Sequence, residues 1–193
     1  MFENRVSDIL RRIDPMGRLI VDVLGSILPS PLILGSGTLV EQPQRVRPFL
    51  LAGAGAVVPR TTRKVMERKT HPIPHLYQVG TRRNPLMLNA EWTGSDLEFW
   101  RPYLADLAET KQVIMSISGR DIDGCVEVCR ELDKYKGAWV YLEINISCAH
   151  SNDLHGMIAR NSEHITRLIS SIKDAGVTAP IALKMGHSVK YPF

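Results

Sequence analysis

Short apolar segments alternate with amphipathic ones along most of the chain from residue 31 onward. The apolar segments are rich in β-branched residues and have the length of buried strands, whereas the others repeat apolar residues every three or four positions, as helices do. This alternation predicts an α/β fold class, with a parallel sheet and crossover helices. The expected strands are 32–34, 54–58, 112–117, 139–146 and 181–184, and the expected helices are 46–51, 96–108, 121–135 and 162–175.

Three segments stand outside this alternation. Residues 2–13 carry apolar side chains at helical spacing, which predicts an amphipathic helix and an N-terminal unit over residues 1–18. Residues 19–28 predict a hairpin that forms a lid over the bottom of the sheet. Residues 63–90 have little periodicity and contain three prolines, so we expect an irregular excursion over the top. Pro102 lies in an expected helix and must fall in its first turn or kink it.

Five strands in this order are the start of an eight-stranded (β/α)8 TIM barrel, a fold of about 250 residues, so residues 19–193 would form an incomplete barrel. An open doubly wound sheet is the alternative. Its first loop should carry the pattern G-x-G-x-x-G, and Gly35-Ser-Gly-Thr-Leu-Val40 lacks the last glycine. The last strand would leave an apolar edge open. We therefore expect a protein partner or self-association to complete the barrel, unless the chain is a truncated product.

The composition is that of one globular domain, with 193 residues, 44% hydrophobic and 23% charged. The net charge of +4 comes from scattered lysines and arginines, which favours solvated loops over a nucleic-acid surface. No apolar run reaches the roughly 18 residues of a membrane span, so we expect a cytoplasmic protein that does not bind membranes. Cys125 and Cys129 are four residues apart on an expected helix, which favours core packing, and no metal site is predicted.

The polar residues that could carry chemistry follow the expected strand 139–146. An amide, a thiol and an imidazole come in quick succession there, at Asn145, Cys148 and His150. In α/β proteins, the loops at the carboxyl ends of parallel strands place reactive side chains over a rigid base. His150 could lower the pKa of the Cys148 thiol or relay its proton, although neighbours in a loop often point apart, so a solvent-exposed imidazole is the alternative.

Five motifs, in their order and spacing, resemble the dihydroorotate dehydrogenase family, closest to its class 1 branch and the related domain of dihydropyrimidine dehydrogenase. The resemblance runs from about residue 19 to 188 and covers the first part of the family's barrel. The motifs are Pro31-Leu-Ile-Leu-Gly-Ser-Gly-Thr38, Gly53-Ala-Gly-Ala-Val-Val58 with Thr61-Thr62, Leu88-Asn-Ala90, Glu143-Ile-Asn-Ile-Ser-Cys148 and Ala182-Leu-Lys184.

This resemblance implies an FMN-dependent oxidoreductase of pyrimidine metabolism that acts on CH–CH groups. Proteins of the family hold FMN at the carboxyl ends of the barrel strands and pass a hydride between a dihydropyrimidine and the flavin. Cys148 matches the cysteine that takes the substrate proton, a role that suits a thiolate next to a carbonyl-activated carbon.

Further matches imply how a flavin and a pyrimidine-like substrate would be bound. Asn145 matches an amide that touches both molecules, and Asn89 matches an asparagine of the substrate loop. Asn152 could replace a missing substrate amide if its loop is shifted. Lys184 matches a lysine near the flavin N1 and O2, where a cation would stabilise reduced flavin. The cofactor residues implied besides Asn145 and Lys184 are Ser36 and Gly37.

The chain also departs from the family pattern. A family lysine next to flavin and substrate aligns with Pro59, and the adjacent Arg60 would point elsewhere if the strand register holds. The substrate loop contains Glu91 and Trp92 in place of small and apolar residues, His150 belongs to an Ala-His pair that replaces Pro-Asn, and no residue matches the glycine-rich turns that hold the FMN phosphate. The alternative function is a catalytically silent half-barrel that serves as a structural or regulatory subunit.

Overall fold

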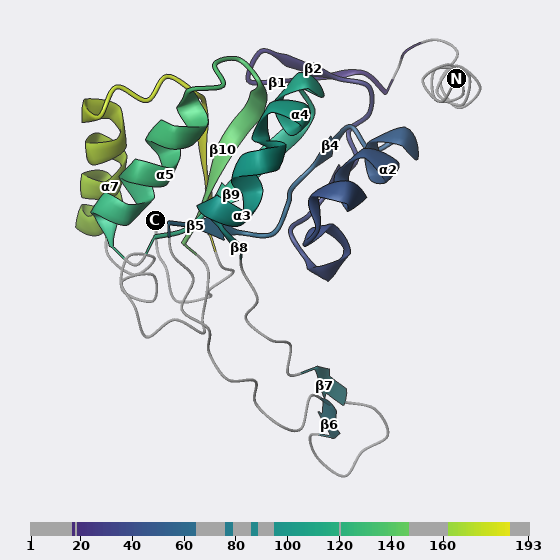
Figure 1. Ribbon diagram of the computed structural model, residues 1–193, viewed down its shortest axis with the longest axis horizontal. Coiled ribbons are helices and arrows are strands. Elements are labelled where there is room, and N and C mark those ends of the chain that lie inside the picture. The colour runs from purple at the N-terminus through teal and green to yellow at the C-terminus, as the bar shows by residue number, and fades with distance from the viewer. Residues whose placement is uncertain are drawn as a thin grey trace.

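A computed structural model describes residues 17, 19–64, 95–119, 121–146 and 162–185, together with the backbone of 76–78 and 86–88. Seven strands form one twisted parallel sheet, in which five follow the order β11-β10-β9-β4-β3 and β5 and β8 lie off this path (Figure 1). The described strands do not close into a barrel, so the predicted α/β class and incomplete barrel are confirmed. Their bounds are β3 Ile33–Leu34, β4 Ala56–Val57, β9 Val113–Ile117, β10 Trp139–Asn145 and β11 Ile181–Lys184.

The helices lie together on one face of this sheet (Figure 1). The predicted helix at 96–108 is interrupted in its middle, because Pro102 has no N–H to donate and a 3-10 turn replaces the α-helical turn there. Side-chain caps from Asp96 and Asp121 begin α3 and α5, and Gly176 in the left-handed region (φ +76°) follows α7. The helices are α2 Val46–Leu51, α3 Leu97–Trp100, α4 Leu104–Glu109, α5 Ile122–Asp133 and α7 Ser162–Asp174, and the 3-10 turns are η1 Thr38–Val40, η2 Pro43–Arg45 and η3 Arg101–Tyr103.

The predicted hairpin is present as β1 (Val21–Val23) and β2 (Ser26–Leu28), which pair antiparallel. Its turn places Leu24 and Gly25 at φ values of +53° and +84°, the sign that tight hairpin turns require at both positions. Leu28 is fully buried against the amino-terminal part of the sheet. The hairpin therefore covers the bottom of the sheet, as the sequence predicts.

The stretch predicted to be irregular contains regular structure, so that expectation is wrong in part. β6 (Leu76–Gln78) and β7 (Leu86–Leu88) pair antiparallel with each other. β5 (Thr62–Arg63) pairs in parallel with β8 (Ser95–Asp96) and with β9. These strands are two or three residues long and lie in or next to a stretch with three prolines and no apolar run, unlike the equally short β3 and β4, which lie in apolar runs. The other residues of 65–94, and the expected helix at 2–13, lie outside the described part of the chain.

Side chains alternate between two apolar clusters on opposite faces of the sheet. Met115 and Ile117 belong to a helix-facing core, whereas Ile114 belongs to a smaller inner cluster that contains Val140 and Leu28 of the hairpin. Successive residues of a regular strand point to opposite faces. In β10 the register shifts between Trp139 and Leu142, so Val140 and Tyr141 both lie against the inner cluster, and regular alternation continues from Leu142. The inner cluster is the floor over which the polar residues described below are placed.

Cys125 and Cys129 lie buried in the helix-facing core and form no disulfide. A hydrogen bond with the Cys125 thiol, and burial, raise the pKa of Cys129 far above the ordinary value of a thiol. Such a thiol stays protonated and unreactive at neutral pH. The prediction of core packing is therefore confirmed for both residues.

Asp133, the last residue of α5, fastens the segment that leads into β11. Its Oδ1 accepts hydrogen bonds from the backbone N–H groups of Thr178 (3.1 Å) and Ala179 (2.8 Å). Hydrogen bonds to a charged acceptor are stronger than neutral ones, so this contact fixes where β11 begins. The position of Lys184 at the end of β11 depends on that anchor.

Gly55 lies immediately before β4, where the chain passes close to Ser30. A Cβ at residue 55 would lie 1.8 Å from the backbone oxygen of Ser30, a distance that no real contact allows. At the same residue, the backbone N–H donates to the carbonyl of Leu32 at 2.8 Å. Glycine is therefore required there for close approach of two backbone segments.

We expect Gly55→Ala to lower the free energy of unfolding by at least about 2 kcal/mol, because the backbone around Ser30 must move to admit the methyl group. Gly137→Ala is the matched control. Its Cβ would meet nothing within 4 Å, and only its φ of +68° is unfavourable, at a cost of about 1 kcal/mol. Urea denaturation of both variants measures the difference, and equal losses would contradict the close approach.

Candidate functional site

Four polar side chains point to the inner face of the sheet near the carboxyl ends of three neighbouring strands. Glu143 and Asn145 alternate with helix-facing residues of β10, and Ser116 and Lys184 occupy the same face of β9 and β11. The parallel register sets Glu143 beside Ser116 and Asn145 beside Lys184. Because all three strands run in one direction, these residues form a polar layer above the inner apolar cluster.

A chain of hydrogen bonds joins three members of this region. The Oγ atoms of Thr61 and Ser116 lie 3.0 Å apart, and Nδ2 of Asn145 donates to Oγ1 of Thr61 at 3.2 Å. Thr61 follows β4, so the contact links three adjacent strands of the sheet. The Asn145 amide is therefore held by residues distant in sequence, and a fixed amide can offer directed hydrogen bonds to a ligand.

Glu143 and Lys184 form an ion pair across β10 and β11. Nζ of Lys184 lies 3.1 Å from Oε1 of Glu143, whose side chain is 13% exposed while that of Lys184 is 36% exposed. Among the described residues, this Oε1 atom has no hydrogen-bond partner, so the contact is a pairing of charges without hydrogen-bond alignment. A pair with this exposure contributes no more than about 1 kcal/mol to stability.

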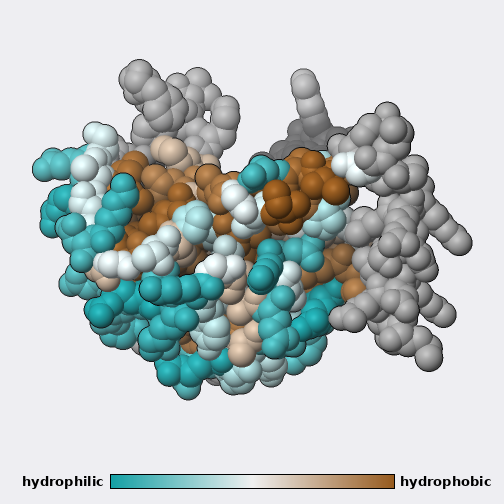
Figure 2. Space-filling model, turned by 90° about the horizontal axis from the view of Figure 1, so that it is seen from above, coloured by the Kyte–Doolittle hydropathy of each residue, from teal (hydrophilic) through white to brown (hydrophobic). Residues whose placement is uncertain are grey.

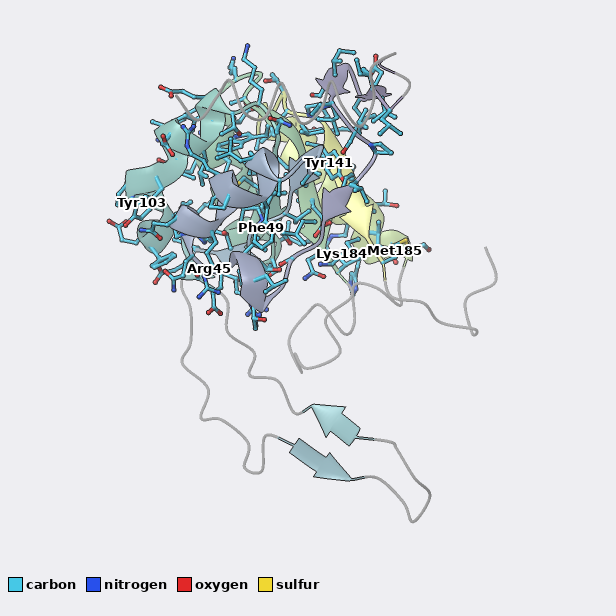
Figure 3. The ribbon with its side chains drawn as sticks, turned by 90° about the vertical axis from the view of Figure 1, so that its right-hand side faces the viewer. Arg45, Phe49, Tyr103, Tyr141, Lys184 and Met185 are labelled. Carbon is cyan, nitrogen blue, oxygen red and sulfur yellow. The ribbon has the colours of Figure 1, made fainter. Side chains whose placement is uncertain are left out.

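Tyr141 lies one step below Glu143 on β10 and is half-buried. Figure 3 shows Tyr141 and Lys184 on the side of the sheet opposite the labelled Tyr103 and Arg45 of the helical layer. Burial, and then the charge of Glu143, raises the pKa of the Tyr141 phenol above its ordinary value of 10.0. The phenol is therefore neutral in the folded protein under ordinary conditions.

Ser36 and Gly37 lie in the loop that follows β3, at the same carboxyl edge of the sheet. Both residues are half-buried, and Gly37 precedes the 3-10 turn η1. A Cβ at Gly35 would meet nothing within 4 Å. Among the described residues, space is therefore open beside Gly35, at the edge where the resemblance implies cofactor contacts.

Sequence reasoning missed a buried cation at this edge. Arg63 of β5 is 7% exposed, and its Nε donates to Oγ of Ser118 at 2.7 Å. Pro59, which aligns with the family lysine, is buried, and the backbone N–H of Arg60 donates to the carbonyl of Val40 at 3.2 Å. A basic residue directly after Thr61 and Thr62 could have drawn attention to Arg63, but the sequence does not reveal the burial of Arg63.

Several predicted site residues cannot be placed. Cys148, Asn89 and Asn152 lie outside the described residues, as does His150. The roles assigned to them therefore stay predictions. Within the described ranges, no group of three or more His, Cys, Asp or Glu residues could hold a metal ion, and no helix is long and apolar enough to cross a membrane.

The raised pKa of Tyr141 gives a pH dependence. A neutral phenol is favoured in the folded state, so its contribution to stability is complete below pH 10 and is lost as the pH rises through the higher folded value. In Glu143→Gln we expect this pKa to fall part of the way back, because the charge is gone but the burial remains. Phenolate absorbance during alkaline titration measures the change, with Tyr141→Phe identifying the signal; a titration unaffected by Glu143→Gln would contradict the contact.

We compared the chain with known proteins in sequence and in structure. No protein-family model matches the chain. The catalytic subunit of dihydroorotate dehydrogenase B (NAD(+)) from Pyrococcus furiosus is 25% identical over 168 residues, which cover 86% of this chain and 52% of that protein. The same subunit from Pyrococcus abyssi is 25% identical over 172 residues, which cover 88% and 54%. The chain thus spans about half the length of these curated relatives.

Solved structures agree in fold. Dihydroorotate dehydrogenase from Eimeria tenella in complex with ferulenol superimposes with a TM-score of 0.61 at 13% identity, over 90% of this chain and 50% of that one. The ligand-free form gives a TM-score of 0.61 at 14% identity, over 90% and 52%. The resemblance predicted from the motifs is therefore confirmed. The chain is similar, in sequence over most of its length and in fold, to the N-terminal portion of the dihydroorotate dehydrogenases.

Proposed function

We propose that the chain provides the first half of a flavin-dependent oxidoreductase of the dihydroorotate dehydrogenase type, acting on the CH–CH group of a pyrimidine-like substrate. The observation that carries this proposal is the inner polar layer. Asn145 and Lys184, which match cofactor-binding residues of the family, lie beside each other at the carboxyl ends of two paired strands. Ligands of α/β proteins bind at that edge.

The residues present fit FMN as the cofactor. The ammonium of Lys184 and the amide of Asn145 offer donors to the polar edge of a flat heterocycle, and the apolar inner cluster offers a floor below them. The accessible backbone at Gly35 leaves room for close approach. When bound, FMN would accept the hydride from the substrate. Lys184 would stabilise negative charge next to it, and Asn145 would orient the ring and the substrate.

The proton would be taken by Cys148, three residues beyond Asn145 on the loop that leaves β10. A thiolate would take the proton from a carbon next to a carbonyl and become a thiol; the hydrogen on the adjacent carbon would leave with its bonding electron pair as hydride, and a C=C bond would form between the two carbons. Asn89 and Asn152 would contact the substrate. The roles of Cys148 and Asn89 rest on their motifs, and that of Asn152 on a shift of its loop.

A closed barrel needs strands against both edges of the sheet. β3 and β11 are the two ends of the five-strand path, and Leu32 (69%), Ile33 (40%) and Met185 (41%) are exposed there. Figure 2, seen from the hairpin end, shows hydrophobic side chains gathered on the open side and hydrophilic ones over the helices. Because parallel sheets are normally covered on both faces, we propose that a protein partner or a second copy supplies the remaining strands in the active form.

One observation favours a second function, that of a silent structural or regulatory half-barrel. Pro59, where the family has a lysine beside flavin and substrate, is buried and has no side-chain donor. A chain that lacks this cation could still associate with a partner through β3 and β11. Flavin binding separates the two functions, since only the oxidoreductase requires it.

The first test is reconstitution with FMN. We expect the assembled protein to bind FMN and dihydroorotate to reduce it. In Cys148→Ser the flavin should still bind, while its reduction slows by about 100-fold or more, because the base is lost. Cys125→Ala is the matched control, since that buried thiol lies in the helix-facing core. Stopped-flow absorbance measures the rate; protein that stays colourless in every mixture would contradict the proposal.

The second test concerns barrel completion. We expect the active form to have a mass above that of the single 21.6 kDa chain, and Ile33→Lys to weaken the assembly by about tenfold or more, because a charge would be buried at the β3 edge. Phe99→Lys is the control, since Phe99 is equally exposed (38%) but lies on α3 in the helical layer. Light scattering after gel filtration measures the mass. A flavin-active monomer would refute completion by another chain.

A further inference from the structure

We propose that Glu143 is a positioning residue for Lys184: it fixes where the ammonium lies and offsets its positive charge next to the bound cofactor. This inference rests on the proposed function, because it assigns a role within the same site. Neither the amides nor the thiol of the motif requires an acid at this position. Glu143 stands between apolar residues of β10 and is the acid that contacts the proposed flavin lysine.

Strand register makes the contact specific. Glu143 is the register partner of Ala182, and Asn145 is the register partner of Lys184, so Glu143 reaches Lys184 diagonally across β10 and β11. Diagonal neighbours of a sheet are within reach of long side chains on a common face. The small side chain of Ala182 leaves the inner face beside Glu143 open for the lysine to fold back. The ammonium is thus drawn toward the floor of the site and away from bulk solvent.

The burial of Glu143 argues against a purely stabilising role. A carboxylate that is 13% exposed loses most of its hydration, and among the described residues its Oε1 has the Lys184 ammonium as a charged contact but no hydrogen bond. Removing an anion from water costs more than a single partly exposed ion pair returns. Glutamine would fit the same space without that cost. The charge of Glu143 is therefore explained by what it does to Lys184.

The charge has a direct consequence for a bound flavin. Lys184 alone would place a full positive charge at the edge of the ring, whereas the pair places opposite charges 3.1 Å apart. Lys184 lies level with Asn145, two residues beyond Glu143, and its side chain is more exposed (36% against 13%), so the cation would be nearer than the anion to a ligand at this edge, and the pair would act as a directed dipole in place of a net charge. Removing the anion should favour any state of the ligand that carries extra negative charge.

The experiment compares Glu143→Gln, Glu143→Asp and Glu131→Gln in the full-length chain, in the assembly in which it purifies. Glu131→Gln is the matched control, because Glu131 pairs with Lys134 at 2.6 Å on the exposed surface of α5. The first measurement needs no cofactor. Acylation of lysines, followed by peptide mass spectrometry, should rise at Lys184 by about threefold or more in Glu143→Gln, since an ammonium held by a carboxylate must leave it to react.

The second measurement uses FMN-loaded protein. In Glu143→Gln the equilibrium between oxidised and reduced FMN should shift on the order of tenfold toward the reduced form, about 30 mV for a two-electron couple. Glu143→Asp keeps the charge and should restore most of the wild-type potential. Glu131→Gln should leave the potential unchanged. A purely structural role for Glu143 would lower stability without moving the potential in this direction.

The outcomes distinguish this inference from the function on which it rests. If no variant binds FMN, the proposed function fails, and the acylation of Lys184 still decides whether Glu143 holds it. If FMN binds but Glu143→Gln changes neither Lys184 acylation nor the potential, the positioning role is overturned while the oxidoreductase stands. If Glu143→Gln does not fold, Glu143→Asp is compared with wild type: its shorter side chain should hold the ammonium less well and raise Lys184 acylation while the potential stays near the wild-type value, and wild-type acylation there would also overturn the role.

Discussion

The parallel register of β9, β10 and β11 is the constraint on which the rest of the structure depends. Parallel strands end at one edge of a sheet, so residues that are 27 positions apart, such as Ser116 and Glu143, become direct neighbours. Alternation then decides which of them face inward. A register slip of one residue would turn Asn145 and Lys184 into the helix-facing core and abolish the site. The anchor that Asp133 provides before β11 therefore matters to chemistry as well as to stability.

Polarity changes along the inner face in the direction of the strands. At the amino ends the hairpin buries Leu28 against Ile114 and Val140, and water is excluded. One step further along β10, Tyr141 is half-buried and its phenol stays neutral; then come the paired charge of Glu143 and the amide of Asn145. Burying a polar group costs the least free energy where the group has a hydrogen-bond or charged partner and lies near the solvent-exposed edge of the sheet. The inner face of the sheet is thus apolar at the amino ends, where the hairpin packs against it, and polar at the carboxyl ends, where a ligand would bind.

Most of the elements could be predicted from the sequence, because long periodic segments such as α5 and α7 and the apolar run of β10 carry strong local signals. β5 and the β6–β7 hairpin could not, since they are short and lie outside any apolar run, whereas the equally short β3 and β4 lie within apolar runs. The candidate site was predictable only in part. Asn145 and Lys184 follow from their motifs, but the contact between Asn145 and Thr61 joins residues 84 positions apart. Glu143 belongs to a motif that the sequence shows, but its pairing with Lys184 is a diagonal contact that follows only from the register of β10 and β11 in the structure.

The Glu143–Lys184 pair also compensates the charge of a lysine that lies on the inner face of an open sheet. An isolated ammonium on the inner face of an open sheet would repel other cations and attract any anion, whereas a paired one is compensated before a ligand arrives. The same pairing holds β10 and β11 together at the edge where further strands would be added. A sheet that presents a preformed, neutral polar layer can be covered without burying an unpaired charge, which is the main electrostatic obstacle to closing a barrel over it. The ion pair would therefore link the proposed cofactor binding and the proposed barrel completion in a single contact.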